Sequence, residues 1–251
     1  MGKGLPVRLA IAVFIFGYLL TLIWTLPAAV VWSQFESRLP AAVTLHGLRG
    51  TLWSGQVARM SVEGIDQGRL SWRWRPGQLL RGQLGLAIVW QPANGKVNAQ
   101  MDASMSSLKL SAITGVLDAA SMAKIHNAPF VLRGNWLLDI PELVLEDFDK
   151  VTAADGRLVW QEAAGGLPQP LFLGHLTARL SAAEDQLLLA LQDEGGPLAL
   201  EGDARWQPGH PMYLDLRMQT RPTAERGLID GLALLGKPDA QGWVRWQQQL
   251  Q

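Results

Sequence analysis

The residue types that most often carry catalysis are sparse and scattered in this chain. It has no cysteine, which excludes disulfides, thiolate metal sites and a cysteine nucleophile. No two histidines have the three- or four-residue spacing of a helical metal site, and none forms a ligand-like pair with a nearby carboxylate; they are His46, His126, His175 and His210. Isolated histidines are typical of surfaces and loops. We therefore predict no metal site and no cofactor.

Two further segments resemble chemical motifs without completing them. Four acids stand close together, at Glu142, Glu146, Asp147 and Asp149. Their polar surroundings favour a solvated loop or strand edge over a buried acid–base pair. The segment 231–238 copies most of a phosphate-binding loop, but a proline replaces the Ser/Thr that would hold Mg²⁺. No Gly-x-Ser-x-Gly elbow occurs either, so we predict no enzymatic activity.

The remaining candidate is a glycine-bracketed segment that follows the N-terminal apolar run. Its residues form a candidate interaction or structural motif: Gly50, Thr51, Trp53, Ser54 and Gly55. From the residues alone, it indicates a tight first hairpin whose tryptophan anchors a sheet.

The apolar run extends from Leu9 to Trp32, 24 residues without a charge. A helix of that length spans roughly 36 Å, enough to cross a bilayer core of about 30 Å. Lys3 and Arg8 precede the run, so the positive-inside bias places the N-terminus in the cytoplasm. A cleaved signal peptide, with a small-residue site near Ala28, is the alternative. Both readings export the rest of the chain.

These observations divide the chain into four parts. Residues 1–8 are a cytoplasmic tail, 9–32 a transmembrane helix, 33–43 a linker and 44–251 a β-domain on the far side of the membrane. The chain is expected to cross its membrane once. Formal charge balances, with 22 basic and 22 acidic residues and no basic tract, so nucleic acid is not expected as a partner.

A Gly-x-x-x-Trp pattern occurs four times in the body of the chain. The tryptophans are Trp72, Trp160, Trp206 and Trp246, and each has an apolar residue two positions earlier. Side chains two apart share one face of a strand, so each unit predicts a strand with an apolar inner face, opened by its glycine. Other alternating segments, separated by Pro/Gly turns, lie at 84–90, 187–191, 198–201 and 213–218.

Two segments have helical spacing instead of alternation. One is 113–124, and the other is 228–235, with Gly236 as its expected cap. The fold class predicted is therefore mainly β: one N-terminal transmembrane helix, then a large twisted antiparallel sheet with two short helices.

The combination of an apolar N-terminal run, the Gly-Thr-Leu-Trp-Ser-Gly segment 50–55 and Gly-x-Leu-x-Trp strands resembles the type II secretion system protein N family. The segment 227–242 is similar to that family's closing segment. The resemblance implies a bitopic inner-membrane subunit with a periplasmic domain. That family has no known catalytic residues, so the resemblance assigns none to this chain. At the level of fold, the sheet is also similar to AsmA-type periplasmic proteins.

Two functions are open at this stage. The first is an assembly subunit that offers strand edges or a sheet face to other secretion subunits. The second is an AsmA-like periplasmic lipid-binding or lipid-transfer protein, whose apolar face shelters acyl chains. A covered face favours the first, and an open apolar face favours the second.

Overall fold

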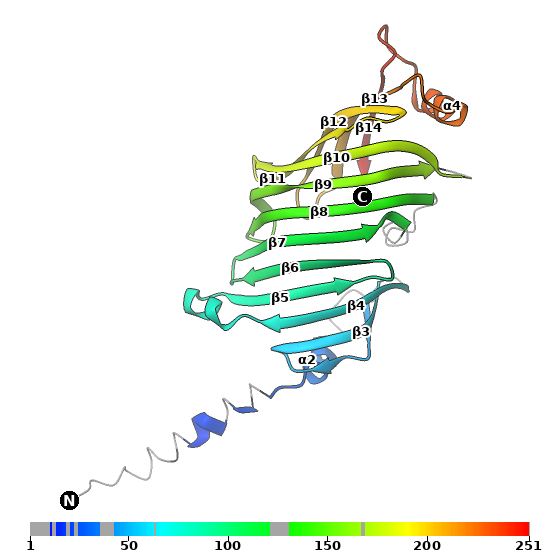
Figure 1. Cartoon of the computed structure of the whole chain (residues 1–251). Helices are drawn as coiled ribbons and strands as arrows, with labels where there is room; N and C mark the ends of the chain where they lie inside the picture. Colours follow the sequence, from blue (N-terminus) through cyan, green and yellow to red (C-terminus); the bar gives the residue numbers. More distant parts are fainter. Residues whose placement is uncertain are drawn as a thin grey trace, which may run out of the picture.

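The computed structural model describes residues 11, 14–18, 21–22, 25–35, 43–62, 64–120, 131–166 and 169–250. One antiparallel sheet of fourteen strands contains most of these residues. Its strands are paired in chain order, with only β2 lying off this path, beside β3 (Figure 1). The prediction of a large antiparallel sheet is confirmed.

The strands are β1 (Val43–His46), β2 (Arg49–Gly50), β3 (Ser54–Val62), β4 (Ile65–Trp74), β5 (Leu84–Gln91), β6 (Gly95–Ala103), β7 (Ser107–Asp118), β8 (Val131–Glu146), β9 (Lys150–Gly166), β10 (Leu171–Ala183), β11 (Gln186–Asp193), β12 (Leu198–Trp206), β13 (Met212–Thr220) and β14 (Val244–Leu250). The helical elements with described bounds are α2 (Ala28–Phe35), the 3₁₀ helix η2 (Pro76–Arg81) and α4 (Arg226–Leu235).

The cross-strand register aligns one apolar row across twelve strands, from β3 to β14. Opposite residues in neighbouring strands point to the same side of a sheet, so this row defines what we call the apolar face. Every member is apolar or glycine: Val57, Leu70, Trp90, Val97, Gly115, Leu138, Leu158, Ala178, Leu191, Gly202, Leu216 and Trp246. The opposite side, the polar face, has charged and polar residues at many of the intervening positions.

All four tryptophans of the repeat lie on strands, as predicted. They belong to β4, β9, β12 and β14, and the register places them on the apolar face: Trp72, Trp160, Trp206 and Trp246. Each is half-buried. The repeat is therefore a recurring unit of one sheet face.

The glycines of the repeat depart from the prediction, because three of the four lie inside their strands. These are Gly68 in β4, Gly156 in β9 and Gly202 in β12. Neighbouring backbone comes very close at these positions: a Cβ on Gly202 would stand 2.2 Å from the carbonyl oxygen of Asp215. The glycine is thus required for close strand packing more than for starting a strand.

The helix predicted over 113–124 is wrong for its first half, since residues 107–118 form strand β7. Ile113 pairs with Ile140, and Leu117 pairs with Trp136, both on the apolar face. A four-residue spacing suits a helix and a strand equally, and Val116 is 45 % exposed on the other side. Residues 119–120 are helical, and 121–130 lie outside the described residues.

The second predicted helix is confirmed as α4, which packs on the apolar face at the C-terminal end of the sheet. Leu228 and Leu232 are buried against a cluster that includes Leu198, Leu200, Met218 and Val244. Gly236 occupies the C-cap position, but its φ of 167° is extended backbone that any residue adopts. Gly236 is therefore the cap that was predicted, in a conformation that does not require glycine.

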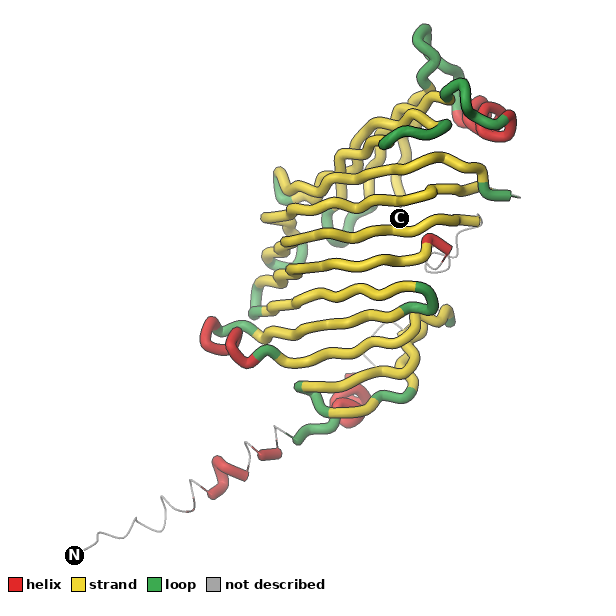
Figure 2. The backbone as a smooth tube through the Cα atoms, viewed as in Figure 1, coloured by secondary structure: helices red, strands yellow, loops and turns green. Residues whose placement is uncertain are grey.

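The two α-helices with described bounds, α2 and α4, lie at opposite ends of the sheet (Figure 1). α2 is beside β3, and α4 is near β13 (Figure 1). The strands from β4 to β10 lie side by side in nearly the same direction. The sheet then twists, so that β12 to β14 cross that direction at a large angle (Figure 2). Among the described residues, no helix has the length and apolar character needed to cross a membrane.

Candidate functional site

The predicted motif forms a turn that ties the N-terminal apolar segment to the sheet. The backbone N–H of Leu52 donates to the carbonyl of Leu26 at 3.1 Å, and Pro27 forms an isolated bridge with Thr51. α2 starts directly after this bridge, at Ala28, which is buried. We call residues 50–55 the junction turn, because it is where the apolar N-terminal segment meets the first strands.

Short hydrogen bonds hold the junction turn closed. The N–H of Thr51 donates to the carbonyl of Ser54 at 2.9 Å, and the N–H of Ser54 donates to the Thr51 hydroxyl at 3.2 Å. Gly50 pairs with Gly55 across this turn. Gly50 has a φ of +96°, a left-handed conformation that side chains disfavour. The Gly-Thr-x-x-Ser-Gly sequence therefore fits the conformation it adopts.

Two tryptophans of β4, Trp72 and Trp74, contact residues 52 and 53 of the junction turn. The indole Nε1 of Trp72 donates to the carbonyl of Leu52 at 3.0 Å. The rings of Trp53 and Trp74 meet with centroids 4.7 Å apart and tilted by 47°. The backbone N–H of Trp74 also donates to the carbonyl of Trp53 at 2.6 Å. Aromatic pairs of this kind stabilise a contact beyond the area they bury.

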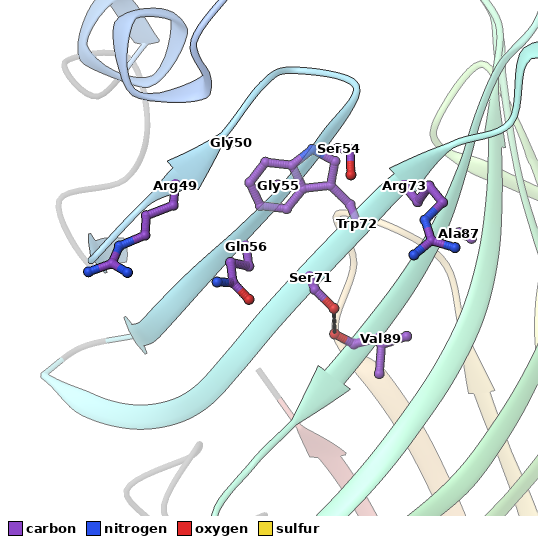
Figure 3. A pocket seen from close by; sticks show the side chains of 10 residues that line it. All are labelled: Arg49, Gly50, Ser54, Gly55, Gln56, Ser71, Trp72, Arg73, Ala87 and Val89. Atoms are coloured by element: carbon purple, nitrogen blue, oxygen red, sulfur yellow. Dashed lines mark hydrogen bonds between the residues drawn. The ribbon is translucent and has the colours of Figure 1, made fainter.

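A shallow hollow of about 560 Å³ opens beside the junction turn (Figure 3). Arg49 from β2 and Arg73 from β4 flank it, and Gln56 and Ser71 lie between them. The lining residues include two cations and no carboxylate: Arg49, Gly50, Ser54, Gly55, Gln56, Ser71, Trp72, Arg73, Ala87 and Val89. Such a lining suits an anion, and it contains no nucleophile paired with a base.

The structure does not bring the histidines and acidic residues considered above together into a metal site among the described residues. His46 and His210 are exposed, and Nδ1 of His175 accepts a bond from the N–H of Glu162 at 3.3 Å. His126 lies outside the described residues.

The acidic segment is a surface feature, as predicted. Glu142 forms an ion pair with Lys109 across β7 and β8. Asp147 lies in the turn after β8, 3.0 Å from Lys150, whose pKa it raises through a hydrogen bond. Both carboxylates are solvent-exposed, and exposed ion pairs of this kind contribute little to stability.

One charged cluster was not found from the sequence. On the polar face of β12 to β14, Arg217 pairs with Glu201, and Arg245 pairs with Asp215. Hydrogen bonding to Arg245 lowers the pKa of Asp215 to about 2. The partners are 16 and 30 residues apart in the chain. Only the strand register reveals these two pairs, in which Arg217 and Arg245 each have their own acid.

These features define a class of protein: a large single sheet, tied at one end to an apolar N-terminal segment, without an assembled catalytic centre among its described residues. The sequence profile of the family described as Type II secretion system (T2SS), protein N matches residues 41–247. The chain belongs to this family. It is therefore a component of type II secretion machinery, as the resemblance seen in the sequence implied.

Similar proteins agree with this assignment. The chain is 26 % identical to Type II secretion system protein N of Aeromonas hydrophila, over 92 % of this chain and 93 % of that protein. It is 25 % identical to the protein of the same name from Vibrio cholerae, over 89 % and 90 % of the two chains. The protein from Klebsiella pneumoniae is 26 % identical over 92 % and 91 %. No solved structure matches the chain.

Proposed function

We propose that this chain is an inner-membrane-anchored assembly subunit of the type II secretion machinery, active in the export of folded proteins across the outer membrane. Residues 9–32 are its anchor, 1–8 face the cytoplasm, and the β-domain 44–251 lies in the periplasm after the linker 33–43. The observation that carries the proposal is the junction turn, whose bond from Leu52 to Leu26 fixes the apolar segment to the sheet. A sheet held in this way is oriented with respect to the membrane.

The proposed contact with other secretion subunits is through strand β14. It ends the strand order and pairs with β13 alone among the described strands. Arg245 is its only charged residue, and most of its side chains are exposed. An edge strand with few charges is able to add a strand from a partner.

Photo-cross-linking in membranes tests this contact. A photo-reactive residue at Gln249, exposed on β14, is expected to give adducts with another secretion subunit. The matched control is Met105, which is 99 % exposed in the turn between β6 and β7. Adducts from both positions, or from neither in a folded membrane-bound chain, would contradict docking at this edge.

A second candidate function is the binding or transfer of lipid. The observation that favours it is the apolar face, which no described helix covers between β4 and β9. Residues such as Leu70, Leu138 and Leu158 remain half-buried there. A photo-reactive residue at Leu138 would then capture lipid acyl chains. We propose no enzymatic activity and no cofactor for either function.

A further inference from the structure

Charge is distributed unevenly along this chain although it balances overall. Residues 43–103 contain seven basic and three acidic residues, whereas residues 104–251 contain twelve basic and eighteen acidic residues. The first part forms β1 to β6, the end of the sheet beside the junction turn. The field of the molecule is therefore positive at this end and negative at the other.

The positive end also has cations without ion-pair partners. Arg49, Arg69 and Arg73 lie within 4.0 Å of no carboxylate among the described residues, whereas Arg75 pairs with Asp102 at 3.0 Å. At the opposite end, Arg217, Arg221 and Arg245 each have an acidic partner. Unpaired guanidinium groups are available to an external anion.

Register brings two of these arginines to one site on the polar face. Arg49 is opposite Gln56, which is opposite Ser71, and Arg73 is opposite Ser54 (Figure 3). Two guanidinium groups thus flank an amide and hydroxyl groups, in the hollow of about 560 Å³. Planar guanidinium groups match the oxygen geometry of a phosphate group.

The position of the hollow indicates the source of that phosphate. Gly50 and Gly55 line the hollow and belong to the junction turn, whose Leu52 is bonded to Leu26. The site therefore lies beside residues 26–27, in the last third of the apolar run 9–32. We propose that the Arg49–Arg73 hollow binds the phosphate head group of an anionic phospholipid from the bilayer that holds residues 9–32. This inference rests on the proposed anchor.

Native mass spectrometry of the full chain in non-ionic detergent tests the proposal. The probe is an equimolar mixture of phosphatidylglycerol and phosphatidylcholine with the same acyl chains. The wild-type chain is expected to retain phosphatidylglycerol selectively. In the double variant Arg49→Gln/Arg73→Gln the ratio of the two bound lipids should fall roughly 30-fold, since each basic residue near an anionic surface contributes about 1 kcal/mol. Added salt should weaken the wild-type preference.

The matched control is Arg179→Gln/Arg205→Gln. These two arginines are exposed on the polar face of β10 and β12 and have no ion pair with a described residue. The control should keep the wild-type lipid ratio. An equal loss in both double variants would overturn the site and indicate a general charge effect. Binding of inorganic phosphate as tight as that of phosphatidylglycerol would overturn the assignment to lipid.

The same preparations separate this inference from the proposed function. Native membranes are washed with alkaline carbonate before the chain is purified. Release of the wild-type chain by the wash would refute the anchor, and with it the lipid source. A chain that stays in the membrane but has no preference for phosphatidylglycerol would refute the head-group site alone.

Discussion

At the junction turn the backbone of Gly55 lies very close to the ring of Trp72. A Cβ built on Gly55 would lie 2.5 Å from Cζ2 of that ring and 2.8 Å from the carbonyl oxygen of Arg49. The Trp72 ring also donates a hydrogen bond to Leu52. The absence of a side chain at position 55 is thus what allows the indole to reach the turn.

The first prediction follows from this contact. Gly55→Ala should lower the free energy of unfolding by about 1–3 kcal/mol, because the ring and the turn must separate to admit a methyl group. Gly77→Ala is the matched control, since nothing lies within 4 Å of a Cβ built there. Urea unfolding of the full chain in detergent measures both. Equal stability of the two variants would show that Trp72 adjusts without loss.

The second prediction concerns Asp215, whose pKa Arg245 lowers from 3.8 to about 2. A depressed folded-state pKa contributes stability above the unfolded value, and this stability is lost as pH falls through the folded value. Asp215→Asn should therefore be less stable than wild type above pH 4, with a difference that shrinks toward pH 2. Asp230→Asn, exposed on α4, is the control. Unfolding curves across this pH range measure the effect, and a constant difference would contradict it.

Among the elements, α4 shows how one helix closes the C-terminal end of the apolar face. Its buried side chains are four residues apart, at Leu228 and Leu232, and they cover Leu198 and Leu200 of β12. Leu234 in the same helix is 88 % exposed. Helical periodicity thus determines which leucines stabilise the sheet.

The third prediction uses this pair of leucines. Leu232→Ala should cost about 2–5 kcal/mol, through lost burial and the cavity left behind. Leu234→Ala should change stability by less than about 0.5 kcal/mol. Denaturant midpoints of the full chain in detergent compare the two. A large loss from Leu234→Ala would show that the exposed side of α4 is covered in the folded protein.

In the whole molecule, a single sheet is joined to an apolar segment at one end, and most of its acidic residues lie toward the other end. The proposed topology orients the sheet relative to the membrane. The junction turn and its arginines would stand nearest to the bilayer, and the acidic strands would stand furthest from it.

The fourth prediction tests that topology. A reporter fused after Gln251 should be active only outside the cytoplasm, because Lys3 and Arg8 hold the N-terminus inside. N-terminal sequencing of the mature chain should begin before residue 9. A sequence beginning near Ala29 would refute the anchor and leave export intact. Reporter activity in the cytoplasm would refute both.

Features that depend on local pattern were predictable from the amino-acid sequence. Alternation in segments such as 213–218 predicted strands correctly, since successive side chains on a strand point to opposite faces. Leu228 and Leu232 predicted α4, and the Gly-x-x-x-Trp units predicted one tryptophan-bearing face. The motif at 50–55 was found because its glycines and tryptophan are adjacent in the chain.

Features that depend on pairing between distant residues became visible only in the folded chain. The spacing of Ile113 and Leu117 fits a helix and a strand alike, and pairing with Ile140 and Trp136 made that segment β7. The register also placed Arg49 on the same polar face as Arg73, and a backbone hydrogen bond joined the junction turn to Leu26. Hydrogen bonds between strands set these contacts, and a local sequence pattern does not specify which strands will form them.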